Sequence, residues 1–188
     1  MAGTRDARER VLRSASALFY ENGIAATGVD AISGHASVGK MSLYRHFPSK
    51  DDLVVAVLRD WDETHLDWLL PQSDLEPRRQ VAAMFDRIAR AAARSGYHGC
   101  PFVRAGLELP AEHPGRKVVR DHKARLRARL RALARALHTA DPAALAWQLV
   151  TLADGAAAEC ALQGSGAPAR AARAMAILAI DAVARDQE

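Results

Sequence analysis

Residues 23–50 read GIAATGVDAISGHASVGKMSLYRHFPSK and decide the fold of this chain. Thr27, followed three residues later by Asp30, resembles a capping box and is expected to open a short helix at about residue 28. Residues 36–39 are mostly small and end in glycine, which favours a tight turn. Residues 40–47 are expected to form a second short helix, which the following proline ends. The pattern therefore predicts two short helices joined by a tight turn.

The second of these helices carries side chains suited to reading duplex DNA. A helix in the major groove needs small polar or basic side chains in its first turn, and aromatic or basic groups beyond it. Lys40 or Arg45 is expected to pair with guanine, whereas Ser42 and Tyr44 would contact the backbone or a thymine methyl group. The predicted DNA contacts, including those that hold register on phosphates, are Thr27, Lys40, Met41, Ser42, Tyr44, Arg45, His46 and Lys50. The alternative is a capped helical hairpin whose charges are incidental.

The composition favours an all-α protein. Of the 188 residues, 49% are apolar but only 5% are aromatic, and alanine and leucine recur throughout, which suits helices better than strands. No apolar run approaches the roughly 18 residues of a membrane span, and the first ten residues lack the apolar stretch of a signal peptide. We therefore expect a cytoplasmic protein without a membrane segment. Cys100 and Cys160 are expected to be free thiols.

Caps, breakers and apolar periodicity predict about nine helices. Leu43 and Phe47, four residues apart, are expected to anchor the third helix. Ser49 should cap the fourth helix, and Asp141 followed by Pro142 should start the eighth. The predicted ranges are 4–22, 28–35, 40–47, 49–70, 75–94, a short helix from residue 101, 114–138, 142–163 and 168–185.

Two long helices in the second half of the chain have unusual surfaces. Residues 116–135 include nine basic side chains and one acidic one, which is typical of the solvated face of a long helix. The last helix has only two polar side chains between residues 171 and 184, so it must be covered on more than one side. We therefore expect the last two helices to form a subunit interface. Polar substitutions at Ile177 or Ile180 are expected to give monomers.

The amino-terminal third of the chain resembles the TetR/AcrR family of bacterial transcription regulators. The similarity covers residues 4–60, and its most specific part is the run Leu-Tyr-Arg-His-Phe-Pro-Ser-Lys at 43–50. Four positions depart from the family pattern. Glycine is common where Ser37 and Met41 stand, and small helix-forming residues are usual where Gly34 and His35 stand.

The resemblance implies an all-helical homodimer whose amino-terminal modules read the half-sites of a palindromic operator. Residues 1–50 would form the helix-turn-helix DNA-binding domain and residues 51–188 an effector-binding and dimerisation domain, connected by the helix of about 49–70. The larger domain would dimerise through a four-helix bundle made of the last two helices of each subunit. Family members usually repress and release DNA when a small molecule binds, so the resemblance implies a repressor. The alternative is a DNA-binding dimer without an effector.

Residues 61–160 supply apolar walls and a few polar groups for a small-molecule cavity, which would suit an apolar or aromatic effector. The predicted effector contacts are Trp61, His65, Trp68, Phe85, Cys100, Phe102, Arg104 and Trp147. Core packing is the alternative for Phe85 and Trp61, and an ion pair with Glu108 on one helix face is the alternative for Arg104. No third ligand or orienting acid stands near Cys100, so we expect neither a metal, a cofactor nor catalysis, although an enzyme using that thiol is a third hypothesis.

Overall fold

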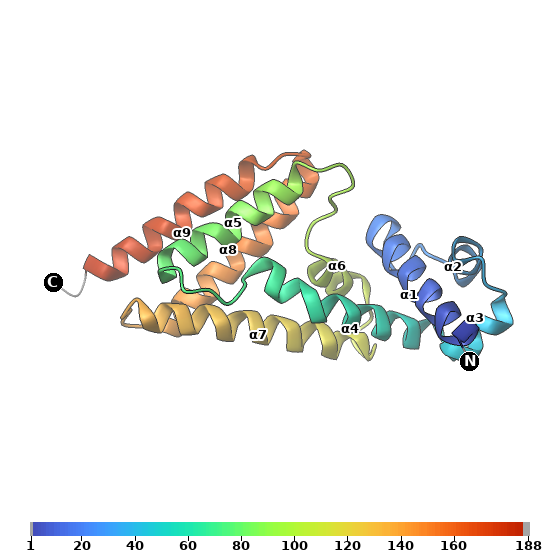
Figure 1. Ribbon diagram of the computed structural model, residues 1–188. Helices are drawn as coiled ribbons and strands as arrows, with labels where there is room; N and C mark the ends of the chain where they lie inside the picture. Colours follow the sequence, from blue (N-terminus) through green and yellow to red (C-terminus); the bar gives the residue numbers. More distant parts are fainter. Residues whose placement is uncertain (1, 186–188) are drawn as a thin grey trace. The chain divides into compact units, whose positions relative to one another are not determined.

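The computed structural model of this chain describes residues 2–185 (Figure 1). Within that range every regular element is a helix, which confirms the predicted all-α fold. The nine helices of the described residues are α1 (Ala2–Asn22), α2 (Val29–Ala36), α3 (Lys40–His46), α4 (Lys50–Leu69), α5 (Pro77–Ala92), α6 (Pro101–Glu108), α7 (Gly115–Ala136), α8 (Pro142–Gln163) and α9 (Ala167–Arg185). Their number is the predicted one, and their ends lie within two residues of the predicted ends.

The described chain forms two compact units. The first comprises the described residues up to Glu63 together with Pro101–Arg120, so that α6 belongs to the same unit as α1, α2 and α3. The second comprises Thr64–Cys100 and the described residues from Asp121 onward. These units describe packing and not activity, so the functional division at residue 50 stays a prediction. No helix within residues 2–185 has the length and apolar character that crossing a membrane requires.

A small apolar core holds α1, α2 and α3 together in the first unit. Leu43 and Phe47 are 0% and 3% exposed, which confirms that they anchor α3. Val11, Ala15 and Phe19 of α1 are also buried, and because they recur every four residues they lie on one face of that helix. The opposite faces of α1 and α3 are therefore left for solvent or a partner.

Two predicted helix starts are confirmed by their hydrogen bonds. The hydroxyl of Ser49 accepts from the backbone N–H of Asp52 at 3.0 Å and donates to its carboxylate at 2.7 Å, so both residues close the first turn of α4. The carboxylate of Asp141 accepts from the N–H groups of Ala143 and Ala144, each at 3.0 Å, at the start of α8. Pro142 occupies the first helical position, where its missing N–H is not needed.

The predicted capping box at Thr27 is wrong. Gly28 is the N-cap of α2, and no side chain caps that helix. The Thr27 hydroxyl instead donates to the carbonyl oxygens of Gly23, at 2.7 Å, and Leu18, at 3.2 Å. The physical reason is that the carbonyl of Gly23, just beyond the end of α1, has no helical N–H partner, and this buried hydroxyl supplies one.

Ser37 ends α2 in the left-handed conformation, with φ 50° and ψ 46°. A residue with a Cβ pays about 1–2 kcal/mol for that conformation, whereas glycine pays about 0.5–1 kcal/mol in backbone entropy. We therefore expect Ser37→Gly to raise the free energy of unfolding by about 0.5–1 kcal/mol and the melting temperature by about 1–4 °C. Thermal melts followed by circular dichroism measure both. Ser95→Gly is the control, because Ser95 is exposed and has no positive φ; equal shifts in the two variants would contradict the explanation.

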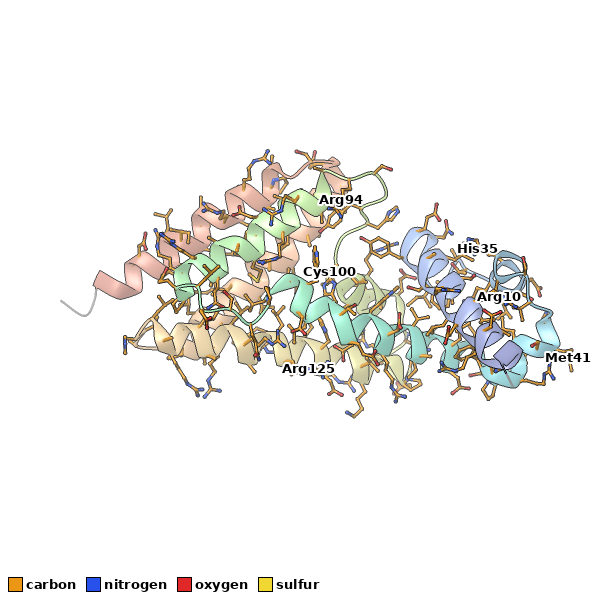
Figure 2. All side chains as sticks on the ribbon, in the orientation of Figure 1. Arg10, His35, Met41, Arg94, Cys100 and Arg125 are labelled. Carbon is orange, nitrogen blue, oxygen red and sulfur yellow. The ribbon has the colours of Figure 1, made fainter. Side chains whose placement is uncertain are left out.

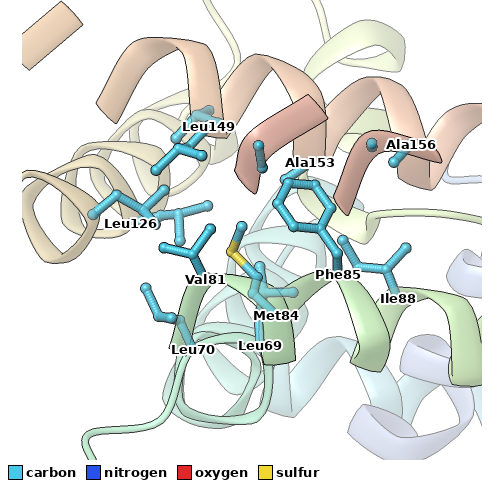
Figure 3. Packing of buried hydrophobic residues seen from close by; sticks show 14 of the residues in the cluster. Leu69, Leu70, Val81, Met84, Phe85, Ile88, Leu126, Leu149, Ala153 and Ala156 are labelled. Carbon is cyan, nitrogen blue, oxygen red and sulfur yellow. The ribbon is translucent and has the colours of Figure 1, made fainter. Parts of the chain in front are cut away.

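The second unit has one apolar core, formed mainly by α5, α8 and α9 with contributions from α4 and α7 (Figure 3). Large side chains of α5, among them Met84 and Phe85, pack against alanines of α8 such as Ala153 (Figure 3). Ile180 of α9 belongs to this core and is 2% exposed. A polar substitution at Ile180 would therefore disrupt folding of the subunit, so the predicted test of association at that residue was wrongly placed.

Candidate DNA-binding interface

The exposed side of α3 gathers the side chains predicted to read DNA. Met41 is 81% exposed and Tyr44 38% exposed, and Arg45 lies on the same exposed side (Figure 2 labels Met41). Ser42 and His46 are half-buried beside them. Since Leu43 and Phe47 fill the core behind, a helix of fixed orientation presents an apolar, an aromatic and a cationic side chain outward. This is the set of groups that a major-groove helix requires.

Lys40, at the start of α3, is held by an acid of the preceding helix. Its Nζ lies 2.7 Å from Oδ1 of Asp30, and both side chains are exposed. The hydrogen bond to Asp30 and the opposite charge raise the pKa of Lys40. An exposed pair of this kind contributes little to stability. The pair therefore masks a cation that duplex DNA would otherwise attract.

Asp30→Asn is expected to increase the affinity for duplex DNA. The substitution removes a negative charge beside α3 and frees Lys40 to approach a phosphate. We expect affinity to rise about 3–10-fold. The slope of log affinity against log salt should become more negative by up to about one per subunit. Fluorescence anisotropy over a range of salt concentrations measures both quantities. Asp60→Asn makes the same change at an exposed position of α4; an equal gain there would show a general charge effect and contradict the role of the Lys40 pair.

Two of the predicted contacts brace the module from within. Thr27 is 3% exposed, and its hydroxyl donates to the backbone carbonyls of Leu18 in α1 and Gly23 just beyond it. Lys50 is half-buried, and its Nζ donates to the carbonyl oxygen of Ile24 at 2.6 Å. Both side chains therefore tie the α1–α2 junction to the rest of the unit. As DNA contacts they remain predictions, and Lys50 would have to leave Ile24 to reach a phosphate.

Three of the predicted effector contacts lie in the first unit. Trp61 of α4 donates from Nε1 to the Ser16 hydroxyl at 2.7 Å, and its ring meets those of Tyr20 and Phe102 edge to face, with centroids 6.4 and 6.5 Å apart. Phe102 is fully buried. These rings join α4 and α6 to α1 by aromatic packing.

Arg104, the third of these residues, does not form the predicted ion pair with Glu108, and its role as an effector contact stays a prediction. Its guanidinium donates to the carbonyl oxygen of Tyr20 at the end of α1. Glu108, one turn further along α6, accepts from the backbone N–H of Ala25 at 3.0 Å. The Glu108 carboxylate also lies so near Gly23, which has φ +91°, that a Cβ there would approach its oxygens to 3.0–3.1 Å. The predicted ion pair on one helix face is thus replaced by a clamp of two α6 side chains on the α1–α2 junction.

The other predicted effector contacts lie in the second unit, some in its core and some at its surface, and their effector role stays a prediction. Phe85 is fully buried in the core, which was the alternative for that residue. Trp147 is 57% exposed, with the guanidinium of Arg127 4.3 Å from its ring centroid. His65 and Trp68 are one turn apart on α4, with ring centroids separated by 5.2 Å.

A polar cluster in the second unit contains Cys100 and residues that the sequence analysis missed. Lys123 of α7 forms an ion pair with Asp154 of α8, and their side chains are only 14% and 29% exposed. Nζ of Lys123 also lies 3.8 Å from Sγ of Cys100. The ring of His122, which is fully buried, lies 5.5 Å from that of His65. One feature of the sequence could have indicated this cluster: Asp154 is the only charged residue between 142 and 158.

Both cysteines are free thiols, as expected, and burial raises the pKa of Cys160. A raised pKa leaves less thiolate at neutral pH, so Cys160 is a poor nucleophile. Among the residues that the structure describes, no group of three or more histidine, cysteine or acidic side chains is arranged to hold a metal ion.

The chain is similar to a family profile and to solved structures of bacterial transcription regulators. The profile of bacterial regulatory proteins, tetR family, matches residues 11–57. A putative TetR transcriptional regulator from Streptomyces avermitilis is 32% identical, with 93% of this chain and 98% of that chain covered and a TM-score of 0.84. SCO4454, a TetR-family transcriptional regulator from Streptomyces coelicolor, is 30% identical, with 97% and 96% covered and a TM-score of 0.80.

Curated relatives match over shorter segments. The transcriptional repressor Rv3405c of Mycobacterium tuberculosis is 34% identical over 108 residues, which are 57% of this chain and 56% of that protein. The transcriptional repressor KstR2 of Mycolicibacterium smegmatis is 42% identical over 62 residues, which are 33% of this chain and 28% of that protein. The chain thus spans about half or less of the length of these curated relatives.

Proposed function

This chain belongs to the TetR family of bacterial transcriptional regulators, and from that premise we propose that it is a homodimeric repressor that binds a palindromic operator and leaves it when a small molecule binds. Members of this family are helix-turn-helix regulators and not enzymes, so the hypothesis of catalysis by Cys100 is dropped. The observation that carries the proposal is the orientation of α3, with Leu43 and Phe47 inward and Tyr44 and Arg45 outward.

Support for a dimer comes from the exposed surface of α8 and α9, which pack against each other. Exposed residues recur at helical spacing on both helices, and most are small or apolar, so that a second pair of helices could approach closely. They are Thr151, Gly155, Ala158 and Leu162 on α8 and Ala171, Ala174, Leu178 and Ala182 on α9. We call this surface the α8–α9 face. Leu162 is 77% exposed and Leu178 57% exposed, and they lie among small residues at helical spacing, so they belong to an apolar stripe and are not isolated exposed side chains.

Support for an effector site comes from the polar cluster around Lys123. Lys123 and Asp154 are partly withdrawn from water and stabilise each other's charge. A ligand with a polar group could therefore replace one of them as the partner of the other. Cys100 contacts Lys123, and the ring of His65 lies beside those of His122 and Trp68, so these side chains would supply the surface for the ligand body. An effector with an aromatic or apolar body and one polar group fits this chemistry.

Operator selection followed by ligand release tests the proposed function. Duplexes bound by the purified chain are enriched from a random or genomic pool, sequenced, and titrated in gel shifts. The proposal predicts an enriched palindrome and its release by at least one member of a panel of apolar and aromatic compounds. Enrichment without release by any compound would support the alternative, a DNA-binding dimer without an effector.

A double variant separates the effector site from the DNA interface. Lys123→Met with Asp154→Leu removes both charges together, so no lone charge is left buried. We expect operator affinity to stay within about threefold of wild type, while the releasing compound loses at least about tenfold in potency (1.4 kcal/mol per factor of ten). Unchanged potency would place the effector elsewhere.

A further inference from the structure

A surface cavity between α1 and α2 is lined by basic and hydroxyl side chains that the functions described so far do not use. It has a volume of about 220 Å³, and its lining residues are Arg10, Arg13, Ser14, His35 and Ala36. All five belong to the first unit, and Arg10 and His35 come from two different helices (Figure 2). We infer that this cavity binds a phosphate group.

The walls of the cavity are positioned by contacts within the unit. Nδ1 of His35 and Oγ of Ser14 lie 3.0 Å apart in hydrogen-bond contact, and Ser14 is 6% exposed. This contact fixes the imidazole of α2 against α1. Because Nδ1 is occupied, the other ring nitrogen, Nε2, is the one left for a ligand.

The charge of the cavity favours an anion. Arg10 is paired with Asp6, one turn earlier on α1, and keeps further N–H donors. Arg13 is exposed and has no acidic partner among the side chains that the structure describes. No acidic residue lines the cavity. Guanidinium groups bind phosphate through paired N–H donors, so two arginines together with the imidazole that Ser14 orients form a suitable set.

The phosphate can come from two sources with the same chemistry. One is a free phosphate or phosphate ester, and the other is the backbone of the DNA that the module binds. The second source rests on the operator binding proposed above, whereas the first does not. The two sources are separated by measuring phosphate binding without DNA, and DNA binding across salt concentrations.

The first measurement is a titration of the full chain with inorganic phosphate, followed by amide NMR shifts at constant ionic strength. We expect saturable shifts confined to residues 10–14 and 35–36. Arg13→Gln should weaken phosphate binding at least tenfold. Arg59→Gln is the matched control, since Arg59 is exposed on α4 outside the cavity, and it should bind phosphate as the wild type does. Melting curves verify that both variants remain folded.

The second measurement is the slope of log affinity against log salt for duplex DNA. If a backbone phosphate occupies the cavity, Arg13→Gln should reduce this slope by about one per subunit, and Arg59→Gln should leave it unchanged. Phosphate-specific shifts with an unchanged slope would support a free phosphate ligand, and a reduced slope would support the DNA backbone. Absence of both effects would overturn the inference. If the wild type binds no duplex, the proposed function fails, while the phosphate titration still decides this site.

Discussion

Replacing Tyr44 and Arg45 together by alanine is expected to lower operator affinity at least about a hundredfold. Each well-placed base contact contributes about 1–3 kcal/mol to discrimination, and the dimer would lose such contacts in both half-sites. Both side chains are exposed, so the fold and the dimer should survive. Gel-shift or anisotropy titration against the selected operator at one fixed salt concentration measures the effect.

The control for this variant must remove a similar charge elsewhere. Arg59→Ala does so on the exposed surface of α4 and should change affinity by less than about threefold. A general loss of positive charge would weaken non-specific and operator binding equally, whereas loss of base contacts weakens operator binding more. If the Tyr44 and Arg45 double variant still binds the operator within threefold of wild type, α3 is not the reading helix.

Leu178→Glu is expected to convert the dimer to a folded monomer. The side chain is exposed in the subunit, so the substitution disturbs no core. In a two-fold symmetric interface it would bury two unpaired carboxylates, one from each subunit, at a cost of several kcal/mol. Sedimentation velocity at micromolar concentration should then show the mass of one chain, with an unchanged helical spectrum. Operator affinity should fall as well, because one module reads only one half-site.

Leu107→Glu is the matched control for association. Leu107 is 84% exposed on α6 and does not belong to the α8–α9 face, so this variant should sediment with the wild type. A dimer that persists in Leu178→Glu, with monomers appearing in Leu107→Glu, would move the interface away from α8 and α9. If both variants remain dimers, the interface includes neither Leu178 nor Leu107.

Helices were predictable from the sequence because their ends are encoded locally. Ser49 and Asp141 each bond to backbone groups within three residues, so the pattern that suggests the cap also contains its partners. The burial of Leu43 and Phe47 was predictable for a similar reason, since their four-residue spacing puts them on one face of α3.

Contacts between distant segments were not predictable in this way. Arg104 and Glu108 have a local partner in each other, yet they bind backbone groups 84 and 83 residues away. In both cases a backbone group without a helical partner outcompetes the local choice, and only the folded chain brings the two together. Thr27 satisfies a local capping pattern, but its hydroxyl donates to the carbonyl oxygens of Gly23 and Leu18, four and nine residues earlier, so two local choices competed and the pattern alone did not decide between them.

The predicted effector contacts show the same limit. Aromatic and polar residues in one segment suggested one cavity, but the fold distributes them among a core, an exposed face and a clamp. The ion pair of Lys123 with Asp154 was not predictable, because the two residues are 31 positions apart. Lys123 lies on a strongly basic helix and Asp154 on a mainly apolar one, so no local pattern links them.

The central claim is that two copies of α3 enter successive major grooves of one duplex. Native mass spectrometry of the chain with its selected operator tests this directly, because it counts chains per duplex. The account predicts two chains on one palindromic duplex, with half-site centres about 10 base pairs, or a multiple of that, apart, and one chain on a duplex carrying a single half-site. A single chain on the full operator, or no complex with any duplex at moderate salt, would contradict it.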